Sequence, residues 1–145
     1  MRALLVVSTV LLGLAGCSAE DPPAARTGLE VVDLRVGDAS LRVEVADTPA
    51  SREAGLRGRA GVPPGTGMVF RFEAARQVDF TMSGVTYPLV AVFVRDGAVV
   101  DVAQMVPCAG NVADCPLYGP ETEVDTVVEA APESLPEVRA GDVVS

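Results

Sequence analysis

The side chains that could do chemistry in this chain are its cysteines, arginines and carboxylates, because its 145 residues include neither histidine nor lysine. Histidine is the usual base near neutral pH, and lysine forms Schiff bases with carbonyl substrates. No serine or threonine has an evident activating partner in the sequence. The composition therefore favours a noncatalytic protein over an enzyme.

An enzyme that uses carboxylates alone is the alternative. A glycan-cleaving hydrolase needs two carboxylates on either side of one cleft at a defined separation. The candidates in the sequence are Glu73, Asp79, Asp101 and Glu121. A domain of this size offers little room for a long glycan groove, so this hydrolase ranks second.

The first residues indicate export. Met1 and Arg2 give a charged start, residues 3–14 are apolar but too short to span a bilayer, and the sequence Leu-Ala-Gly-Cys ends at Cys17. This pattern resembles the lipobox of bacterial lipoproteins, in which the cysteine is lipidated and the chain is cut before it. We therefore expect a signal peptide at 1–16 and a lipid anchor on the outer face of the cell membrane. The alternative is an ordinary secretory signal with an incidental cysteine.

The remainder of the chain divides into a tether and one domain. Residues 17–28 contain two adjacent prolines, small residues and no hydrophobic period, which predicts a flexible tether. Residues 29–145 are enough for a single compact domain. A net charge of −9 without a basic stripe argues against nucleic acid and against docking of the folded domain on anionic lipid. The membrane link that we expect is the lipid anchor alone.

The two other cysteines, Cys108 and Cys115, predict a disulfide, because an exported protein meets oxidants. Closing so short a loop stabilises a domain by roughly 2 to 3 kcal/mol. The spacing is not CxxC, which argues against a thioredoxin-like redox role. Two cysteines without any histidine provide too few ligands for zinc, and the sequence indicates no metal or cofactor.

A β-hairpin should organise the domain that carries these residues. Two apolar runs, 89–94 and 98–102, flank an Asp-Gly pair, which favours a type I′ turn. The two-residue loop fixes the register, so Phe93 should face Val100. Both faces of the first strand are apolar, and we expect it in the middle of a sheet with material above and below.

Other elements follow from alternation and capping signals. Further strands are expected at 31–36, 41–45, 68–72, 77–82, 123–130 and 140–144. In the strand 123–130 we expect Val124, Thr126 and Val128 inward and Glu123, Asp125 and Glu129 on a solvent face. Those acids could form a weak calcium site, but one strand lacks the chain reversal that cages an ion.

A short helix is predicted from Pro49 to Leu56, capped by Thr48 and ended by Gly58. Arginines crowd its C-terminal end. Two interpretations of Arg59 remain open. It is either a solvated cation that complements the helix dipole or part of an anion or carboxylate site.

Several motifs resemble a known family, DUF-192. They are Gly55-Leu56 with Arg59, Gly67-Met68-Val69-Phe70, Phe80-Thr81-Met82-Ser83-Gly84-Val85 with Pro88-Leu89, Pro107-Cys108 with Cys115-Pro116 and Tyr118, and Gly141-Asp142-Val143. The resemblance covers the chain from about Leu41 to Val144. That family of bacterial and archaeal proteins has no agreed function. The resemblance implies a single compact, mainly β domain, similar to an antiparallel sandwich or barrel with one or two short helices.

The chain departs from the family pattern at polar positions. Many members carry Trp where this chain has Thr81, Lys-Asn where it has Ser83-Gly84, and Asp where it has Val90. If the Lys, Asn and Asp form a polar site in relatives, that site is absent here. The resemblance supplies a fold and no catalytic residue.

We therefore expect a noncatalytic binding or interaction module of the cell envelope. It would recognise a small ligand, a glycan or another envelope protein where loops gather beside Arg59, Met82, Tyr87, Pro107 and Tyr118. A third hypothesis is a structural role in envelope assembly, which predicts an exposed apolar patch in place of a concave site.

Overall fold

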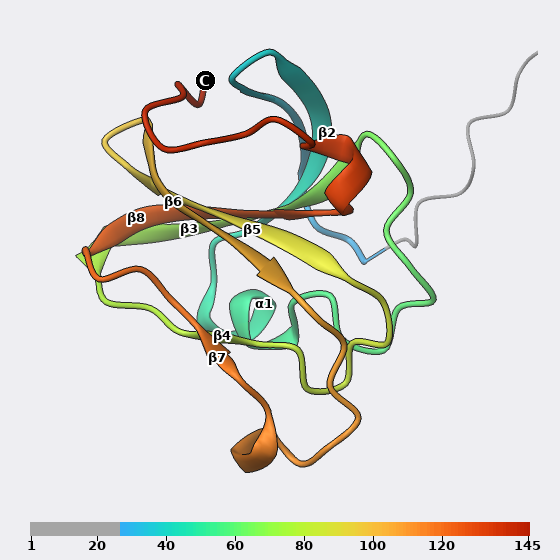
Figure 1. Cartoon of the computed structure of the whole chain (residues 1–145). Coiled ribbons are helices and arrows are strands. Elements are labelled where there is room, and N and C mark those ends of the chain that lie inside the picture. The colour runs from blue at the N-terminus through green and yellow to red at the C-terminus, as the bar shows by residue number, and fades with distance from the viewer. Residues whose placement is uncertain (1–26) are drawn as a thin grey trace, which may run out of the picture.

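The computed structural model describes residues 27–145. The expected signal peptide, Cys17 and most of the tether lie outside the described residues. The strands form one six-stranded sheet, in the order β1-β2-β3-β8-β5-β6, and one small sheet of β4 and β7 (Figure 1). The strands are β1 (Val31–Val36), β2 (Ala39–Ala46), β3 (Thr66–Arg76), β4 (Phe80–Thr81), β5 (Leu89–Arg95), β6 (Ala98–Met105), β7 (Leu117–Tyr118) and β8 (Val124–Ala130). The helical elements are α1 (Pro49–Ala54) and the 3₁₀ turns η1 (Val112–Asp114) and η2 (Pro132–Ser134).

The predicted mainly β class is confirmed, but the sheet is not antiparallel throughout. Strands β2 and β3 run parallel, whereas the other strand pairs are antiparallel. A parallel pair cannot be joined by a tight turn and needs a crossover connection. Helix α1 and the loop 55–65 supply it, and α1 lies beneath the large sheet (Figure 1).

The central hairpin lies where its two apolar faces predict. Strand β5 pairs with β8 on one side and β6 on the other, and its residues from Leu89 to Val94 are all buried. Asp96 and Gly97 have φ angles of 51° and 75°, as a type I′ turn requires. The Asp-Gly pair and the apolar runs were therefore sufficient to place this hairpin.

The register of the hairpin departs from the prediction after its second pair. Val94 faces Val99 as the two-residue loop dictates, but Phe93 pairs with Asp101 and not with Val100. A β-bulge between the two positions inserts one extra residue and shifts every later pair by one. The expected pairing of Phe93 with Val100 is therefore wrong.

One face of the large sheet, here called the valine face, has an aliphatic core. Its buried members include Leu34, Val36, Leu41, Val43, Val45, Val69, Val90, Val92, Val94 and Val128. The C-terminal segment closes this face at the top of Figure 1 by bonding to both outer strands. The backbone of Ser145 exchanges two hydrogen bonds with Arg35 of β1, and the Val99 N–H of β6 donates to Asp142 at 2.8 Å. The sheet is thereby drawn toward a barrel without closing.

The opposite face, here called the cavity face, is covered by α1 and the small sheet (Figure 1). Its core is richer in aromatic and sulfur-containing side chains. The Phe80 ring lies edge-on to Phe70 at 4.9 Å and to Phe93 at 6.1 Å between centroids. Three of the four phenylalanines thus meet in one core, while Phe72 is only partly buried against it.

The elements covering the cavity face are shorter than predicted. Thr48 caps α1, since its hydroxyl accepts a hydrogen bond from the Ser51 N–H at 3.1 Å and its own N–H donates to the Ser51 hydroxyl at 3.0 Å. The helix ends at Ala54 and not before Gly58, because Gly55 adopts a φ of 49°. The strand expected at 77–82 is reduced to the two residues of β4.

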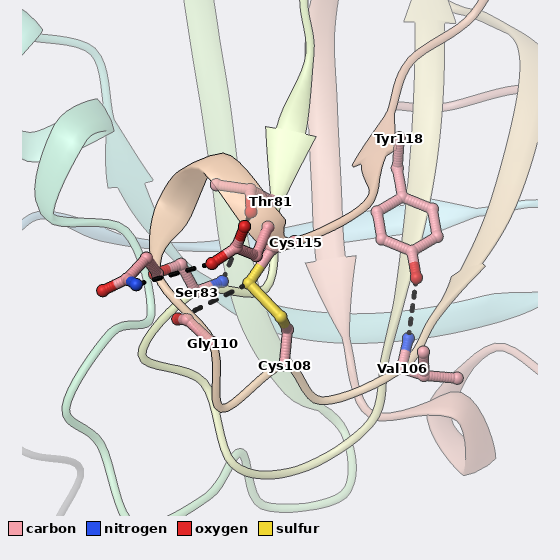
Figure 2. Close-up of a disulfide and its surroundings, with 9 residues drawn as sticks. Thr81, Ser83, Val106, Cys108, Gly110, Cys115 and Tyr118 are labelled. Carbon is pink, nitrogen blue, oxygen red and sulfur yellow. Dashed lines mark hydrogen bonds between the residues drawn. A yellow bond between two sulfur atoms is a disulfide. The ribbon is translucent and has the colours of Figure 1, made fainter.

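Cys108 and Cys115 form a disulfide that closes the loop below the small sheet (Figure 2). Cys108 also forms an isolated parallel β-bridge with Ser83, next to the cavity face. The Tyr118 hydroxyl accepts a hydrogen bond from the Val106 N–H at 3.3 Å. The disulfide thus closes the loop on itself, and the bridge to Ser83 and the hydrogen bond to Tyr118 fasten it to the cavity-face layer.

Candidate functional site

Two carboxylates lie in one row across the cavity face. Glu44 of β2 pairs with Met68 of β3, Met68 pairs with Glu129 of β8, and Glu129 pairs with Ala91 of β5. Directly paired residues project from the same face of a sheet. Within residues 27–145, Glu44 and Glu129 are the buried charged residues, with 8% and 5% of their surface exposed.

The expectation that Glu129 lies on a solvent face is wrong. Strand β8 runs between β3 and β5 in the interior of the sheet, and a buried core lies on each face of the sheet there. Val128 packs into the valine face, while Val127 and Glu129 belong to the cavity face. Glu129 therefore does not share an exposed acidic face with Glu123 and Asp125.

The other buried carboxylate, Glu44, is neutralised from within the chain. Its side chain forms an ion pair with Arg59, and the exposed fractions are 10% for the Glu44 side chain and 18% for the Arg59 side chain. The Thr27 hydroxyl donates a second hydrogen bond to the same carboxylate. Because α1 ends at Ala54, Arg59 lies beyond the helix end and binds a carboxylate of its own chain.

A cavity of about 390 Å³ opens on the cavity face between α1, the segment 76–82 and the sheet. Its walls combine charged and polar side chains with apolar ones. The apolar wall residues include Leu56, Phe70, Phe80, Met82 and Val85. Glu129 lines the cavity from the sheet side, and within residues 27–145 no fully enclosed side-chain oxygen or nitrogen lacks a hydrogen-bond partner.

Burial sets the protonation of Glu129. Desolvation disfavours the charged form and raises the pKa of this carboxyl from its ordinary 4.5 to about 8. At neutral pH the group is thus a carboxylic acid, which can donate one hydrogen bond and accept others. A neutral acid that lines a cavity can form a hydrogen bond with an occupant of that cavity.

Tyr87 lies near Glu129 and near Arg59, the partner of Glu44. Its hydroxyl donates a hydrogen bond to the Leu56 carbonyl at 3.0 Å, which fixes the chain just after α1. Burial raises the pKa of Tyr87, the Arg59 cation lowers it, and the charge of Glu129 raises it further. Arg59, Tyr87 and Glu129 are therefore electrostatic neighbours.

Arginines gather at the mouth of the cavity. Arg52 donates hydrogen bonds to the carbonyls of Asp47 and Arg71, at 2.5 and 2.8 Å. The guanidinium groups of Arg52 and Arg76 lie over the ring of Phe72, at 5.1 and 5.8 Å from its centroid. A third arginine, Arg57, also lines the mouth.

The mouth also has two carboxylates, Glu53 and Asp79, which line it together with the three arginines. Among the described residues, neither Arg57 nor Arg76 forms an ion pair. The mouth therefore has a local excess of positive charge, although the chain as a whole has a net charge of −9.

Of the five residues expected at a ligand site, the structure places Met82 in the cavity wall. Arg59 and Tyr87 do not line the cavity, although the charges of Arg59 and Glu129 both affect the pKa of Tyr87. Pro107 and Tyr118 belong to the disulfide-bonded region and do not line the cavity. Whether these five residues bind a ligand stays a prediction.

The carboxylates proposed for a hydrolase are not assembled in one cleft. Asp79 lines the mouth of the cavity, whereas Glu73, Asp101 and Glu121 are exposed and do not line it. Sequence reasoning missed Glu129, the carboxylate that does face the cavity. The available signal was its position in the sequence Val-Val-Glu-Ala-Ala, where one acid interrupts an apolar run.

Two further observations concern metals and membranes. Within residues 27–145, no three histidine, cysteine, aspartate or glutamate side chains gather closely enough to hold a metal ion. None of the helices in the same part of the chain has the length and apolar character needed to cross a bilayer.

Fold and site together define a β domain with a small cavity beneath its sheet and a buried acid facing that cavity. Residues 32–145 match the DUF192 family, an uncharacterized ACR family, and the chain belongs to it. The resemblance found in the sequence is thereby confirmed. A comparison with curated proteins gave no significant match.

Two solved structures share the fold. One, from Sinorhizobium meliloti 1021, is a proposed transcription regulator with 26% sequence identity and a TM-score of 0.72, and the match covers 81% of this chain and 94% of that one. The other is a protein of unknown function from Novosphingobium aromaticivorans DSM 12444. It has 26% identity and a TM-score of 0.73, and the match covers 87% of this chain and 94% of the other.

Proposed function

We propose that this protein is a noncatalytic binding module of the cell envelope, anchored by a lipid on Cys17 and exposed on the outer face of the membrane. The observation that supports binding is the cavity beneath the sheet, with apolar side chains among its wall residues and the buried Glu129 carboxyl on its sheet side. Ligand sites are typically concave and apolar, with a few placed polar groups. The cavity volume falls within the range of small-molecule sites.

The anchor and the location are supported by the sequence around Cys17 and by the disulfide, which suits an oxidising compartment. We do not propose a transcription-regulator role for this chain, although one is proposed for the Sinorhizobium relative. A net charge of −9 offers little to hold nucleic-acid phosphates.

Calorimetric melting of the full-length Cys17→Ser chain, which lacks the lipid-accepting thiol, tests binding against a panel of metabolites, sugars and peptidoglycan fragments. We expect saturable stabilisation by at least one panel member. Ala54→Trp, at an exposed helix position that lines the mouth, should abolish it. Ala50→Trp, on the same helix but away from the cavity, should not. No saturable hit, or equal binding by both variants, would refute the cavity as the site.

The anchor is tested separately by feeding cells an alkyne-tagged fatty acid. The wild-type protein should take up the label and remain with the membrane fraction, and the Cys17→Ser chain should do neither. An unlabelled wild-type protein would show that the segment 1–16 is an ordinary secretory signal.

A further inference from the structure

The cavity combines two features that restrict what it can hold. Its inner polar group, Glu129, is a neutral acid at neutral pH, and its mouth carries the excess of arginines. A cationic ligand would have to pass three guanidinium groups and then ionise a carboxyl that burial keeps protonated. Both steps are unfavourable, because like charges repel and a buried charge loses its hydration.

An anionic ligand meets the opposite situation. Arg57 and Arg76 form no ion pair with residues 27–145, so both are available to a carboxylate at the mouth. Arg52 is already held by two backbone carbonyls and by the Phe72 ring, which suits it to fixing the mouth. The acidic Glu53 and Asp79 reduce the excess charge at the mouth without removing it.

The interior then selects the rest of the ligand. Between mouth and sheet the walls include leucine, valine, methionine and phenylalanine side chains, which favour a flat or compact apolar body. At the sheet, the Glu129 acid lines the cavity and can donate a hydrogen bond to an occupant. An occupant with an acceptor at that end keeps this donor paired, whereas one without an acceptor would displace water and leave the donor unpaired, which is costly.

We infer that the cavity binds a small amphipathic carboxylate, with its anionic group at Arg57 and Arg76, its apolar body between Leu56 and Phe80, and a hydroxyl or carbonyl group against Glu129. This inference rests on the proposed binding function and names the ligand class for that site. The structure thereby assigns Glu129 the role of a hydrogen-bond donor to the ligand.

A pH titration can separate the effect of Glu129 on binding from the effects of the charged and titratable groups around it. Tyr87 faces it from the loop before β5, and its pKa is raised from 10.0, so it stays neutral in the range tested. The neighbours on the adjoining strands, Met68 and Ala91, do not titrate. The remaining charged groups of the surrounding elements are the Arg59–Glu44 pair and, at the mouth, Arg52, Glu53, Arg57, Arg76 and Asp79.

Four probes of similar shape separate the effect of the ligand's charge from the effect of its distal hydroxyl. They are 4-(hydroxymethyl)benzoate, the neutral 4-(hydroxymethyl)benzamide, the cationic 4-(hydroxymethyl)benzylamine, and 4-methylbenzoate, which lacks the hydroxyl. Titration calorimetry with the full-length Cys17→Ser chain should rank the hydroxymethyl benzoate first. We expect the benzamide and the 4-methylbenzoate to bind roughly tenfold more weakly and the amine not at all. Arg57→Gln and Arg76→Gln should each weaken the benzoate about tenfold, while the exposed Arg42→Gln, outside the cavity, should not.

The pH profile tests Glu129 itself. Affinity for the hydroxymethyl benzoate should fall as pH rises from 7 to 9, because Glu129 loses the proton that it donates. Glu129→Gln keeps an N–H donor and should bind at all these pH values without the fall. If the amine binds best, or if Glu129→Gln abolishes binding of the benzoate, the inference is wrong and the site is cationic or needs an ionised carboxylate.

The failures of the two proposals are distinguishable. If none of the four probes binds but another panel compound binds and is blocked by Ala54→Trp, the ligand class is wrong while the binding module stands. If neither the probes nor the panel give saturable binding, both proposals are wrong.

Discussion

The two faces of the large sheet bury their residues in different ways, and strand β8 shows this with two consecutive residues. Val128 on the valine face is 0% exposed among aliphatic neighbours, and Glu129 on the cavity face is 5% exposed beside an open cavity. The valine face is covered by the C-terminal segment, whereas the cavity face is covered by a six-residue helix, a two-stranded sheet and loops. A cavity of about 320 Å³ also opens at the edge of the valine face beside Val36 and Leu135, but no buried charged residue of the described chain lines it. The difference between the faces is therefore the buried acid that the cavity face brings to its cavity.

The strongest test moves the carboxyl to the valine face. Val128→Glu places an acid between Val69 and Val92, which pair with it from the neighbouring strands. With no cavity and no polar partner there, we expect loss of several kcal/mol, enough to prevent folding at pH 7. Circular dichroism and amide NMR spectra measure the result.

The matched control is Val128→Leu, which adds volume without polarity and should cost only about 1 to 3 kcal/mol. A Val128→Glu chain that melts at the same temperature as Val128→Leu would show that the two faces tolerate an acid equally. The contrast between the faces would then be unfounded.

The second test concerns pH. The pKa of Glu129 is about 8 in the folded protein against an ordinary 4.5, so between these values the folded state keeps a proton that the unfolded state has lost. The contribution of the Glu129 carboxyl to the free energy of unfolding is fully present below pH 4.5 and is lost as pH rises through 8. Between these values the free energy of unfolding should fall by roughly 1 kcal/mol per pH unit. Urea unfolding at pH 5, 6.5 and 8 measures the slope.

Glu129→Gln supplies the control for this pH dependence. The amide does not titrate, so the difference in unfolding free energy between the wild type and this variant should change with pH by the slope given above. Parallel curves for the two proteins would mean that the Glu129 carboxyl is already ionised when buried.

The fold was predictable wherever a local signal sets the structure. Asp96-Gly97 fixed the central turn, and Thr48 with Pro49 fixed the start of α1. The bulge beside Phe93 was not predictable, because nothing in the local sequence distinguishes a bulged hairpin from a regular one. The parallel pairing of β2 and β3 likewise depends on where the chain returns after α1 and not on the strands' own residues.

The site was less predictable than the fold for a related reason. Alternation assigns Glu129 to one face of β8 but does not tell whether that face is covered, and the covering comes from α1 and the segment 76–82. Arg59 was recognised as a candidate for binding a carboxylate. Its partner, Glu44, lies fifteen positions away in a strand that reads as polar on that side, so the pair appears only in the folded chain.

The third test removes the disulfide of the loop next to the cavity face. Replacing both Cys108 and Cys115 with Ser should lower the unfolding free energy by roughly 2 to 3 kcal/mol, since the open loop gains entropy when unfolded. Hydrogen exchange should speed up around the loop and β4, which it adjoins through the Ser83 bridge, more than in β1 and β2. Equal acceleration on both faces would mean that the disulfide stabilises the whole domain and not the cavity side.

The smallest expected effect concerns the second buried carboxyl. Arg59→Ala leaves Glu44 without its cation in a site where the Glu44 side chain is 10% exposed, and we expect a loss of about 2 kcal/mol, less than for a fully enclosed pair. Adding Glu44→Gln to Arg59→Ala should recover most of that loss, because the amide has no charge to desolvate. Chemical unfolding of the wild type, both single variants and the double variant measures the coupling between the two side chains. A coupling near zero would return Arg59 to the solvated cation of the alternative interpretation, and the burial of Glu44 on the cavity face would then not depend on its arginine.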